Sequence, residues 1–318
     1  MVSLSSLRSA LLCCMLACSA PCSFTQSSGA VKAAPPPGVS YTNENFQPGE
    51  SSSPAALARK EADLRAALAS QPDSPSLLYA LALVERQEDN PRASLDTYTQ
   101  AAKHRRPTAH ELRSVALDYV LLNDIDDAIH WLEVAVSMDP SDADILYSLG
   151  RCYYTKDRFA DASKMFQQAL AIRPNSVKVE ENLGLVYDAM NKPQEAEAAL
   201  RKAVSWANAD GKDEWPFLDL GGFLLDHDRS KEALEPLQTA VRIHPLSAIA
   251  HEKLGRALLA NQQNAAGIAE LEQAAKLDPK NPKVHFELGR ALRQAGLTEQ
   301  AKKEFALSQQ LYATHSEE

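Results

Sequence analysis

The sequence predicts an all-α protein built from repeated helix pairs, and three observations support this fold class. Leucine-glycine pairs recur at a nearly constant interval, apolar residues follow the spacing of amphipathic helices, and strong helix formers dominate the chain after residue 54. The 318 residues are 45% hydrophobic and 24% charged, which is ordinary for a protein with a packed core. Runs of β-branched residues are scarce, so no sheet is expected.

The charge balance limits the kinds of partner. The chain carries 33 Lys and Arg against 42 Asp and Glu, a formal net charge of −9, and its pI is about 5.5. A protein that binds nucleic acid in general needs a basic surface to neutralise phosphates. We therefore expect no nucleic-acid partner.

The first 17 residues are typical of an export signal. One positive charge, at Arg8, precedes the apolar run "ALLCCMLA" over residues 10–17, which is shorter than the roughly 20 residues of a membrane-spanning helix. We expect a signal peptide over residues 1–17 and export to the periplasm or outer envelope. The alternative is an apolar N-terminus that is never processed.

The sequence offers three alternative sites for cleavage of the signal peptide. The tripeptide "MLA" ahead of Cys18 resembles the bacterial lipoprotein pattern, in which the cysteine is acylated, although leucine is more usual where Met15 stands. Ordinary cleavage after Ala20 would leave a proline first, and cleavage after Ala30 would follow "SSGA". Cys18 is the candidate for lipid attachment, and a lipid there would be the chain's only expected contact with a membrane.

We expect residues 18–54 to form a tether. They are rich in Ser, Pro and Gly and show no sustained hydrophobic period, so they lack the apolar surface that offsets the entropy of folding. The triple proline at 35–37 stiffens part of this segment. Residues 55–74 begin with "AALARKEADLRAALAS", whose composition predicts a helix that caps the N-terminal end of the repeats.

A period of 34 residues organises the rest of the chain. Five glycines each follow a leucine, with spacings of 34, 37, 34 and 34 residues, and these are Gly150, Gly184, Gly221, Gly255 and Gly289. Alanines share the period at Ala128, Ala162, Ala196 and Ala233, and again at Ala135, Ala169, Ala203, Ala240 and Ala274. Prolines share it at Pro140, Pro174, Pro245 and Pro279. The repeat is therefore present in residue identities as well as in hydrophobicity.

Two helices fit into each period. In the unit at 143–176, the residues of a first apolar stripe lie at helical spacing and are Leu146, Leu149, Gly150 and Tyr153. A second stripe follows the polar break "TKD" and consists of Ala162, Phe166 and Ala169. Asp157 is expected to cap the second helix and Pro174 to stop it. Small residues at facing positions let the two helices approach closely.

These residues resemble the pattern of the tetratricopeptide repeat family. The matching positions are Leu146, Leu149-Gly150, Tyr153, Ala162, Phe166, Ala169 and Pro174. The resemblance implies a right-handed α-solenoid of stacked antiparallel helix pairs, with the first helices lining the concave surface. The repeats would occupy residues 75–108, 109–142, 143–176, 177–213, 214–247, 248–281 and 282–315, and would leave a tail at 316–318.

Several repeats depart from the pattern. The first has Glu85 where tyrosine is usual and Ser94 where alanine is usual, which predicts a distorted repeat. The fourth carries three extra residues, which we place in "NADGKDE", and Pro236 is expected to kink the second helix of the fifth. The last helix has no long capping helix after it, so this end is a candidate surface for self-association. Its apolar residues are Leu307, Leu311 and Tyr312.

The sequence lacks motifs for catalysis and for metal binding. It has no HExxH, GxSxG, GxGxxG or Walker phosphate loop, and no CxxC pair in the repeats. His251 and His285 share a repeat position but have no further ligands at zinc-like spacing, so we expect them to pack between helices. Cys152 has a positive neighbour in Arg151 but no nearby histidine to act as a base. We expect no catalytic residue, no metal and no cofactor.

The resemblance also implies a binding groove along the first helices. Carried over by register, its lining residues are Arg113, Tyr147, Arg151, Tyr154, Asn182, Asp188, Trp215, Asp219, Glu252, Arg256, Phe286 and Arg290. Tyrosine, tryptophan and arginine are enriched at binding hot spots. The alternative is that Tyr147, Tyr154 and Phe286 only pack against adjacent first helices. No repeat has the Lys and Asn that the family's clamp for chaperone tails places at its fifth and ninth positions.

We therefore expect a noncatalytic, exported scaffold that binds a peptide or a protein segment in this groove. Enzymes that contain such repeats add a separate catalytic domain, for which the repeats leave no room in this chain. Two alternatives stay open. One is a subunit that regulates an enzyme or recruits its substrate, and the other is a mainly self-associating structural protein.

Overall fold

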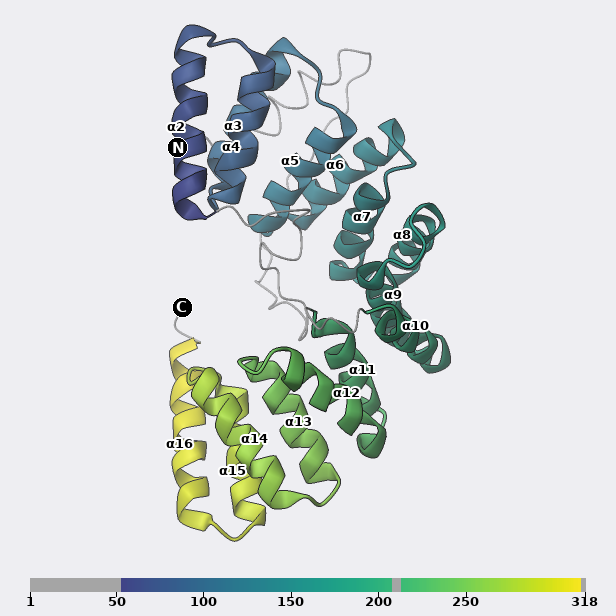
Figure 1. Cartoon of the computed structure of the whole chain (residues 1–318), viewed down its shortest axis with the longest axis vertical. Helices are drawn as coiled ribbons and strands as arrows, with labels where there is room; N and C mark the ends of the chain where they lie inside the picture. The colour runs from purple at the N-terminus through teal and green to yellow at the C-terminus, as the bar shows by residue number, and fades with distance from the viewer. Residues whose placement is uncertain (1–52, 208–212, 316–318) are drawn as a thin grey trace, which may run out of the picture. The chain divides into compact units, whose positions relative to one another are not determined.

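The computed structural model describes residues 53–207 and 213–315, and every regular element in these ranges is an α-helix (Figure 1). The expected signal peptide, Cys18, the tether up to residue 52 and the tail at 316–318 lie outside the described residues. The helices of the first half are α2 (Pro54–Ser70), α3 (Pro75–Gln87), α4 (Pro91–His104), α5 (Ala109–Leu121), α6 (Ile125–Met138), α7 (Ala143–Thr155) and α8 (Phe159–Ile172). Those of the second half are α9 (Val177–Ala189), α10 (Pro193–Trp206), α11 (Trp215–Asp226), α12 (Ser230–Ile243), α13 (Ala248–Ala260), α14 (Asn264–Leu277), α15 (Pro282–Gln294) and α16 (Thr298–His315).

The chain divides into two compact units, Met1–Pro174 and Asn175–Glu318. In the first unit, α3 pairs with α4, α5 with α6 and α7 with α8, and α2 packs on α3. Each second helix also contacts the first helix of the next pair within the unit, as α4 does with α5 and α6 with α7. The second unit has the same arrangement in its pairs α9/α10, α11/α12, α13/α14 and α15/α16. These stacked helix pairs confirm the all-α solenoid fold class.

A left-handed residue joins the two helices of every pair. At the fifteenth position of each repeat φ is positive, at Asp89, Asn123, Asp157, Asn191, Asp228, Gln262 and Gly296. The next amide then bonds back five residues, as the Arg158 amide does to the Tyr153 carbonyl at 2.9 Å. Asn and Asp tolerate this conformation better than most residues, which explains their recurrence here. The expectation that Asp157 caps the second helix was wrong, because α8 begins at Phe159 with Arg158 at its N-cap.

Other helix ends have recognisable capping residues, and the stop predicted at Pro174 is confirmed. Thr108 and Glu111 form a capping box at the start of α5, and Pro75 occupies the first turn of α3 behind Ser74. Helix α8 ends at Ile172, two residues before Pro174. Helix α12 is continuous through Pro236, and the kink expected there stays a prediction.

Within each of the five Leu-Gly pairs, the glycine lies against a large side chain of the partner helix. A Cβ built on Gly150 would lie 2.6 Å from Cε1 of Phe166, which is closer than real Cβ contacts allow. The same contact recurs between Gly184 and Leu200, Gly221 and Leu237, Gly255 and Leu271, and Gly289 and Phe305. Helix-pair packing therefore requires glycine at these positions, as the repeat pattern predicted.

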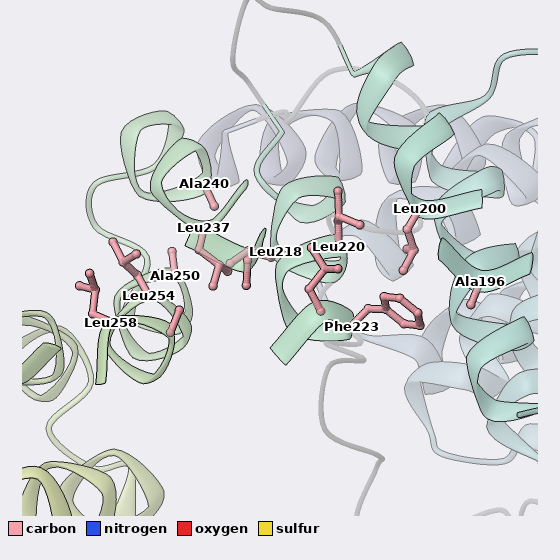
Figure 2. Packing of buried hydrophobic residues seen from close by; sticks show 13 residues of the cluster. Ala196, Leu200, Leu218, Leu220, Phe223, Leu237, Ala240, Ala250, Leu254 and Leu258 are labelled. Atoms are coloured by element: carbon pink, nitrogen blue, oxygen red, sulfur yellow. The ribbon is translucent and has the colours of Figure 1, made fainter. Parts of the chain in front are cut away.

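Within the second unit, a core cluster extends across neighbouring helix pairs. This cluster contains Leu200 of α10, Leu220 of α11, Leu237 of α12 and Leu254 of α13. Figure 2 shows these side chains between the helices that carry them. The first three positions come from two adjacent repeats, so neither pair buries its apolar face without its neighbour. Within residues 53–207 and 213–315, none of the helices combines the length and hydropathy needed to span a bilayer.

We predict that Gly150→Leu destabilises the protein by overpacking. The new side chain must displace the Phe166 ring, which is fully buried, and we expect a loss of about 1–3 kcal/mol in the free energy of unfolding. Urea unfolding of the two proteins measures this difference. Gln168→Leu, at an exposed position of α8, is the matched control and should change stability little. Equal stability of Gly150→Leu and the parent would contradict the packing described here.

Candidate functional site

The first helices of the pairs carry the residues expected to line a groove. In the first unit, α5 carries Arg113, and α7 carries Tyr147, Arg151 and Tyr154. In the second unit, the residues are Asn182 and Asp188 on α9, Trp215 and Asp219 on α11, Glu252 and Arg256 on α13, and Phe286 and Arg290 on α15. The structure therefore distributes them over two faces, one in each unit, and these faces are described separately.

Two tyrosines of α7 pack against the second helix of their own pair. The ring of Tyr147 is 4% exposed and lies 5.9 Å from the ring of Phe166. Tyr154 is half-buried, with its ring 5.6 Å from that of Phe159. These two ring contacts lie within the pair, and the alternative of packing against adjacent first helices stays a prediction. Arg151, between them on α7, is also buried.

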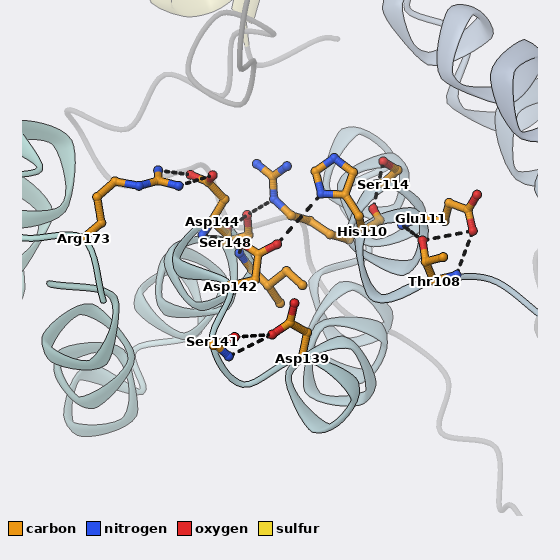
Figure 3. Close-up of polar contacts among 12 residues, drawn as sticks. Thr108, His110, Glu111, Ser114, Asp139, Ser141, Asp142, Asp144, Ser148 and Arg173 are labelled. Atoms are coloured by element: carbon orange, nitrogen blue, oxygen red, sulfur yellow. Dashed lines mark hydrogen bonds and ion pairs between the residues drawn. The ribbon is translucent and has the colours of Figure 1, made fainter. Parts of the chain in front are cut away.

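Arg113 is a buried charge with a fixed orientation. Its Nε donates to Oγ of Ser148 at 3.0 Å, and this hydroxyl in turn donates to the backbone carbonyl of Asp144 at 2.8 Å. Burial lowers the pKa of Arg113, and the carboxylate of Asp144 opposes that effect. This carboxylate is bound by both terminal nitrogens of Arg173 at 2.9 Å, as Figure 3 shows. The guanidinium of Arg113 is therefore positioned by a hydroxyl, and the carboxylate of Asp144 that acts on it is bound by Arg173.

The unusual residues of the first repeat have structural causes. Oγ of Ser94 donates to Oδ2 of Asp118 at 2.6 Å, and both side chains are fully buried. Burial raises the pKa of Asp118 to about 8, and the charge of Arg86 and the Ser94 hydrogen bond oppose it. Glu85, also buried, accepts a hydrogen bond from Arg65 of α2 at 3.2 Å. The departures at 85 and 94 thus serve contacts to α2 and α5, which the one-repeat pattern could not reveal.

The face of the second unit is more exposed. Phe286 is 46% exposed with its ring 5.7 Å from that of Phe305, and Arg290 is exposed one turn further along α15. Arg256 is half-buried between Asp226 and Glu287, at 3.7 Å from each carboxylate. Arginine and aromatic groups are therefore available here for contact with a partner.

Other candidates on this face are engaged within the unit. Glu252 is buried and pairs with Lys283 at 2.7 Å, and Asp188 lies 3.0 Å from the ring of His227. Trp215, Asp219 and Asn182 are half-buried. A cavity of about 340 Å³ lies between α13 and α15, and its charged lining residues are Arg256, Glu287 and Arg290. Burial raises the pKa of Glu287, and the nearby Glu252 adds to the effect.

The two histidines at equivalent positions make equivalent contacts between helices. Nδ1 of His251 lies 2.6 Å from Oε2 of Glu270, and its Nε2 lies 3.0 Å from the carbonyl of Pro245. His285 makes the same two contacts with Glu304 and Pro279, at 2.7 and 3.1 Å. Both ring nitrogens are therefore engaged by neighbouring residues. Nowhere in the described ranges do three His, Cys, Asp or Glu side chains gather as a metal site would require.

Cys152 lies in the packed interior of the first unit. Its side chain is 2% exposed, and burial raises the pKa of its thiol to about 12, although Arg151 opposes this effect. The nucleophilic form of cysteine is the thiolate, so the thiol is held in its unreactive form. The structure gives Cys152 a packing role.

Comparison with protein families defines the class of protein. Three family models, each described as a tetratricopeptide repeat, match residues 119–180, 181–210, and 218–268 with 253–314. Together they cover more than half of the chain, which therefore belongs to the tetratricopeptide repeat family. The matches begin at residue 119, so the first repeat, with Glu85 and Ser94, lies outside them. Proteins of this family are generally noncatalytic scaffolds that bind other proteins, which supports a protein partner for this chain.

Three known proteins are similar to parts of this chain in sequence or in fold. It is 24% identical to tetratricopeptide repeat protein 7A of Homo sapiens over 118 residues, 37% of this chain and 13% of that protein. A chain in the crystal structure of the APC/C hetero-tetramer Cut9–Hcn1 is 14% identical, with a TM-score of 0.61 over 80% of this chain and 50% of that one. PilW, described as a type IV pilus biogenesis factor, is 18% identical, with a TM-score of 0.59 over 64% of this chain and 94% of its own. At these identities the two structures show a shared fold, and this chain spans half or less of the first two proteins.

The buried carboxyl of Asp118 predicts a pH-dependent stability. The folded protein keeps a proton on Asp118 up to about pH 8, whereas the unfolded chain releases it near the ordinary value of about 4. The free energy of unfolding should therefore fall as the pH rises from about 4 to about 8. Asp118→Asn keeps an oxygen that accepts from Ser94 and cannot ionise, so its stability should fall less.

Urea unfolding at several pH values in this range measures the effect. Asp96→Asn, at an exposed position of α4, is the matched control and should follow the parent. A pH dependence that is the same in Asp118→Asn and the parent would show that Asp118 is ionised in the folded protein.

Proposed function

We propose that this protein is a noncatalytic scaffold that binds a peptide or a protein segment along the first helices of its repeats. The observation that carries the proposal is the set of arginine and aromatic side chains accessible on the face of the second unit. Phe286 and Arg290 of α15 are exposed there, and Arg256 of α13 and Trp215 of α11 are half-buried. Large rigid rings and guanidinium groups are the anchors most often found at protein interfaces.

The proposal extends to the cell envelope and to a lipid anchor. The apolar run at 10–17 and the "MLA" tripeptide before Cys18 support export and acylation of that cysteine. A tether of residues 18–54 would then hold the repeats away from the membrane surface. PilW, which has the same fold, is described as a pilus biogenesis factor, and this description agrees with a role in assembly at the envelope.

Self-association is the second candidate function. At the C-terminal end of the second unit, Tyr312 of α16 is 55% exposed and lines one cavity with Phe286, and Leu307 on the same helix is 36% exposed. Exposed apolar groups of this size on the last helix of a repeat stack favour contact with another surface. The partner in this case would be a second copy of the chain.

We predict that Phe286→Ala/Arg290→Ala loses the partner that the parent binds. Both proteins would be crosslinked in the native cells, purified, and analysed by mass spectrometry for bound proteins and for the processed N-terminus. Removing the exposed ring and the guanidinium takes away two anchors of the proposed interface, so recovery of the partner should fall about tenfold or more. The matched control is Leu246→Ala/Arg242→Ala, which removes an exposed apolar group and an exposed arginine elsewhere in the second unit.

Equal recovery of partners by both double variants would contradict binding at this face. Recovery of the chain alone, together with a molecular mass that rises with concentration in sedimentation, would favour self-association instead. An intact Met1 on the native protein would contradict export.

A further inference from the structure

The first unit contains a cavity of about 460 Å³ where α3, α4 and α5 meet. Its floor and walls include the rings of Tyr79 and Tyr98 and the side chain of Leu83. Its charged lining residues are Arg86, Arg105, Glu111 and Arg113, and His110 also lines it. Arginines therefore outnumber carboxylates in the lining by three to one.

The single carboxylate of the lining already has its partners. Both oxygens of Glu111 accept from the guanidinium of Arg105, at 2.6 and 3.2 Å, and one of them also accepts from the backbone amide of Thr108 at 2.7 Å. Arg105 in turn lies over the ring of Tyr79, with 4.3 Å between its Cζ and the ring centroid. This pair is thus neutral, and Arg86 and Arg113 are the lining arginines that form no ion pair, although the charge of Arg86 also acts on the buried carboxyl of Asp118.

The two remaining arginines are held in place by neutral groups. Arg113 is only 4% exposed and donates through Nε to Ser148, while Arg86 donates through Nη1 to the carbonyl of Ser114 at 3.3 Å. Within the described residues, neither guanidinium has a carboxylate at ion-pair distance. Their positive charges are close enough to act on each other, since Arg86 adds to the lowering of the Arg113 pKa that burial causes.

The two carboxylates whose charges act on Arg113, those of Asp144 and Asp142, accept hydrogen bonds from other groups. Asp144 is bound by Arg173, and Oδ1 of Asp142 accepts from two amides at the start of α7, at 2.8 and 3.1 Å (Figure 3). A buried cation without a paired anion is costly, because the protein interior screens charge poorly. The buried Arg113 and the half-buried Arg86 line the same cavity, so an anion bound there would be stabilised by charge-assisted hydrogen bonds.

We propose that this cavity is a carboxylate-binding site, in which Arg86 and Arg113 bind an acidic side chain or a C-terminal carboxylate of the partner segment. The proposal rests on the protein-binding function above and adds a second contact point, in the first unit. The tyrosine rings and Leu83 would accept the apolar part of the residue that bears the carboxylate. These arginines stand at the twelfth position of one repeat and the fifth of the next, whereas the family's clamp for chaperone tails uses the fifth and ninth, here Tyr79 and Leu83.

The test is a titration of the ¹⁵N-labelled full chain with small anions, read at the Nε–Hε signals of arginine by NMR. Two isomeric probes separate the sources of the carboxylate: N-acetylglutamate α-amide carries it on the side chain, and N-acetylglutamine carries it at the C-terminus. Sodium phosphate and sodium chloride at matched ionic strength are the comparison salts. We expect a saturable shift of the Arg113 signal with at least one of the two isomers, and the isomer that binds more tightly identifies the source.

Two variants, one inside the cavity and one outside it, distinguish binding at the cavity from a general effect of charge. Arg86→Gln should weaken binding of the isomer about tenfold, the loss expected on removal of one charged donor. Arg92→Gln, at an exposed position of α4, removes the same charge outside the cavity and should bind like the parent. A shift with phosphate alone, a shift that follows ionic strength for every salt, or equal binding by Arg86→Gln and the parent would overturn the proposal.

This titration contains no protein partner, so its outcome is separate from that of the crosslinking experiment. If no saturable shift is seen while the protein still binds its partner, only the carboxylate-binding site is contradicted. If the shift is seen but the protein captures no partner, the carboxylate-binding site is supported and the scaffold function is contradicted.

Discussion

The contact on which the structure depends is the close approach of the two helices in each pair. A glycine on the first helix faces a leucine or phenylalanine of the second helix with no room for a Cβ between them, as at Gly150 and Phe166. In the first two repeats alanine takes this place, and both Ala82 and Ala116 are fully buried. Because a small residue takes this place in every repeat, the two helices of each pair approach closely, and the pair stacks on the next through its remaining apolar surface.

The fifth position of the first helix differs in exposure between the two units. Tyr147 and Phe286 stand at this position and contact a phenylalanine ring of the second helix in their own pair, yet Tyr147 is buried and Phe286 is exposed, with the exposed Arg290 one turn further along α15. The two units therefore offer different chemistry on equivalent positions. One presents exposed rings and guanidinium groups, and the other holds a cavity with the buried cation Arg113.

The sequence predicted the fold class well because the helix-pair contact is local in the chain. Gly150 and Phe166 are both within one 34-residue period, so the pattern of one repeat contains the whole contact. The turn chemistry was misjudged at Asp157, since a polar residue between two helices suits an N-cap and a left-handed turn equally well, and only the backbone angle distinguishes them.

Residue positions along the first helix did not predict which side chains would be accessible. Register placed Arg113 and Phe286 at the same repeat position, yet one is 4% and the other 46% exposed. The difference comes from neighbours in other repeats, such as Ser148 beside Arg113. The cavity arginine Arg86 was missed for the same reason, because its relation to Arg113 depends on the packing of α3 against α5.

A double-mutant cycle on Gly221 and Leu237 tests the helix-pair contact most directly. All three of the nearest atoms that a Cβ on Gly221 would meet belong to Leu237, at 2.5, 2.5 and 3.3 Å. Gly221→Ala should therefore destabilise the parent, but in the Leu237→Ala background it should be neutral or stabilising by up to about 1 kcal/mol, the helix preference of alanine over glycine. An equal loss of stability in both backgrounds, measured by urea unfolding, would contradict the account.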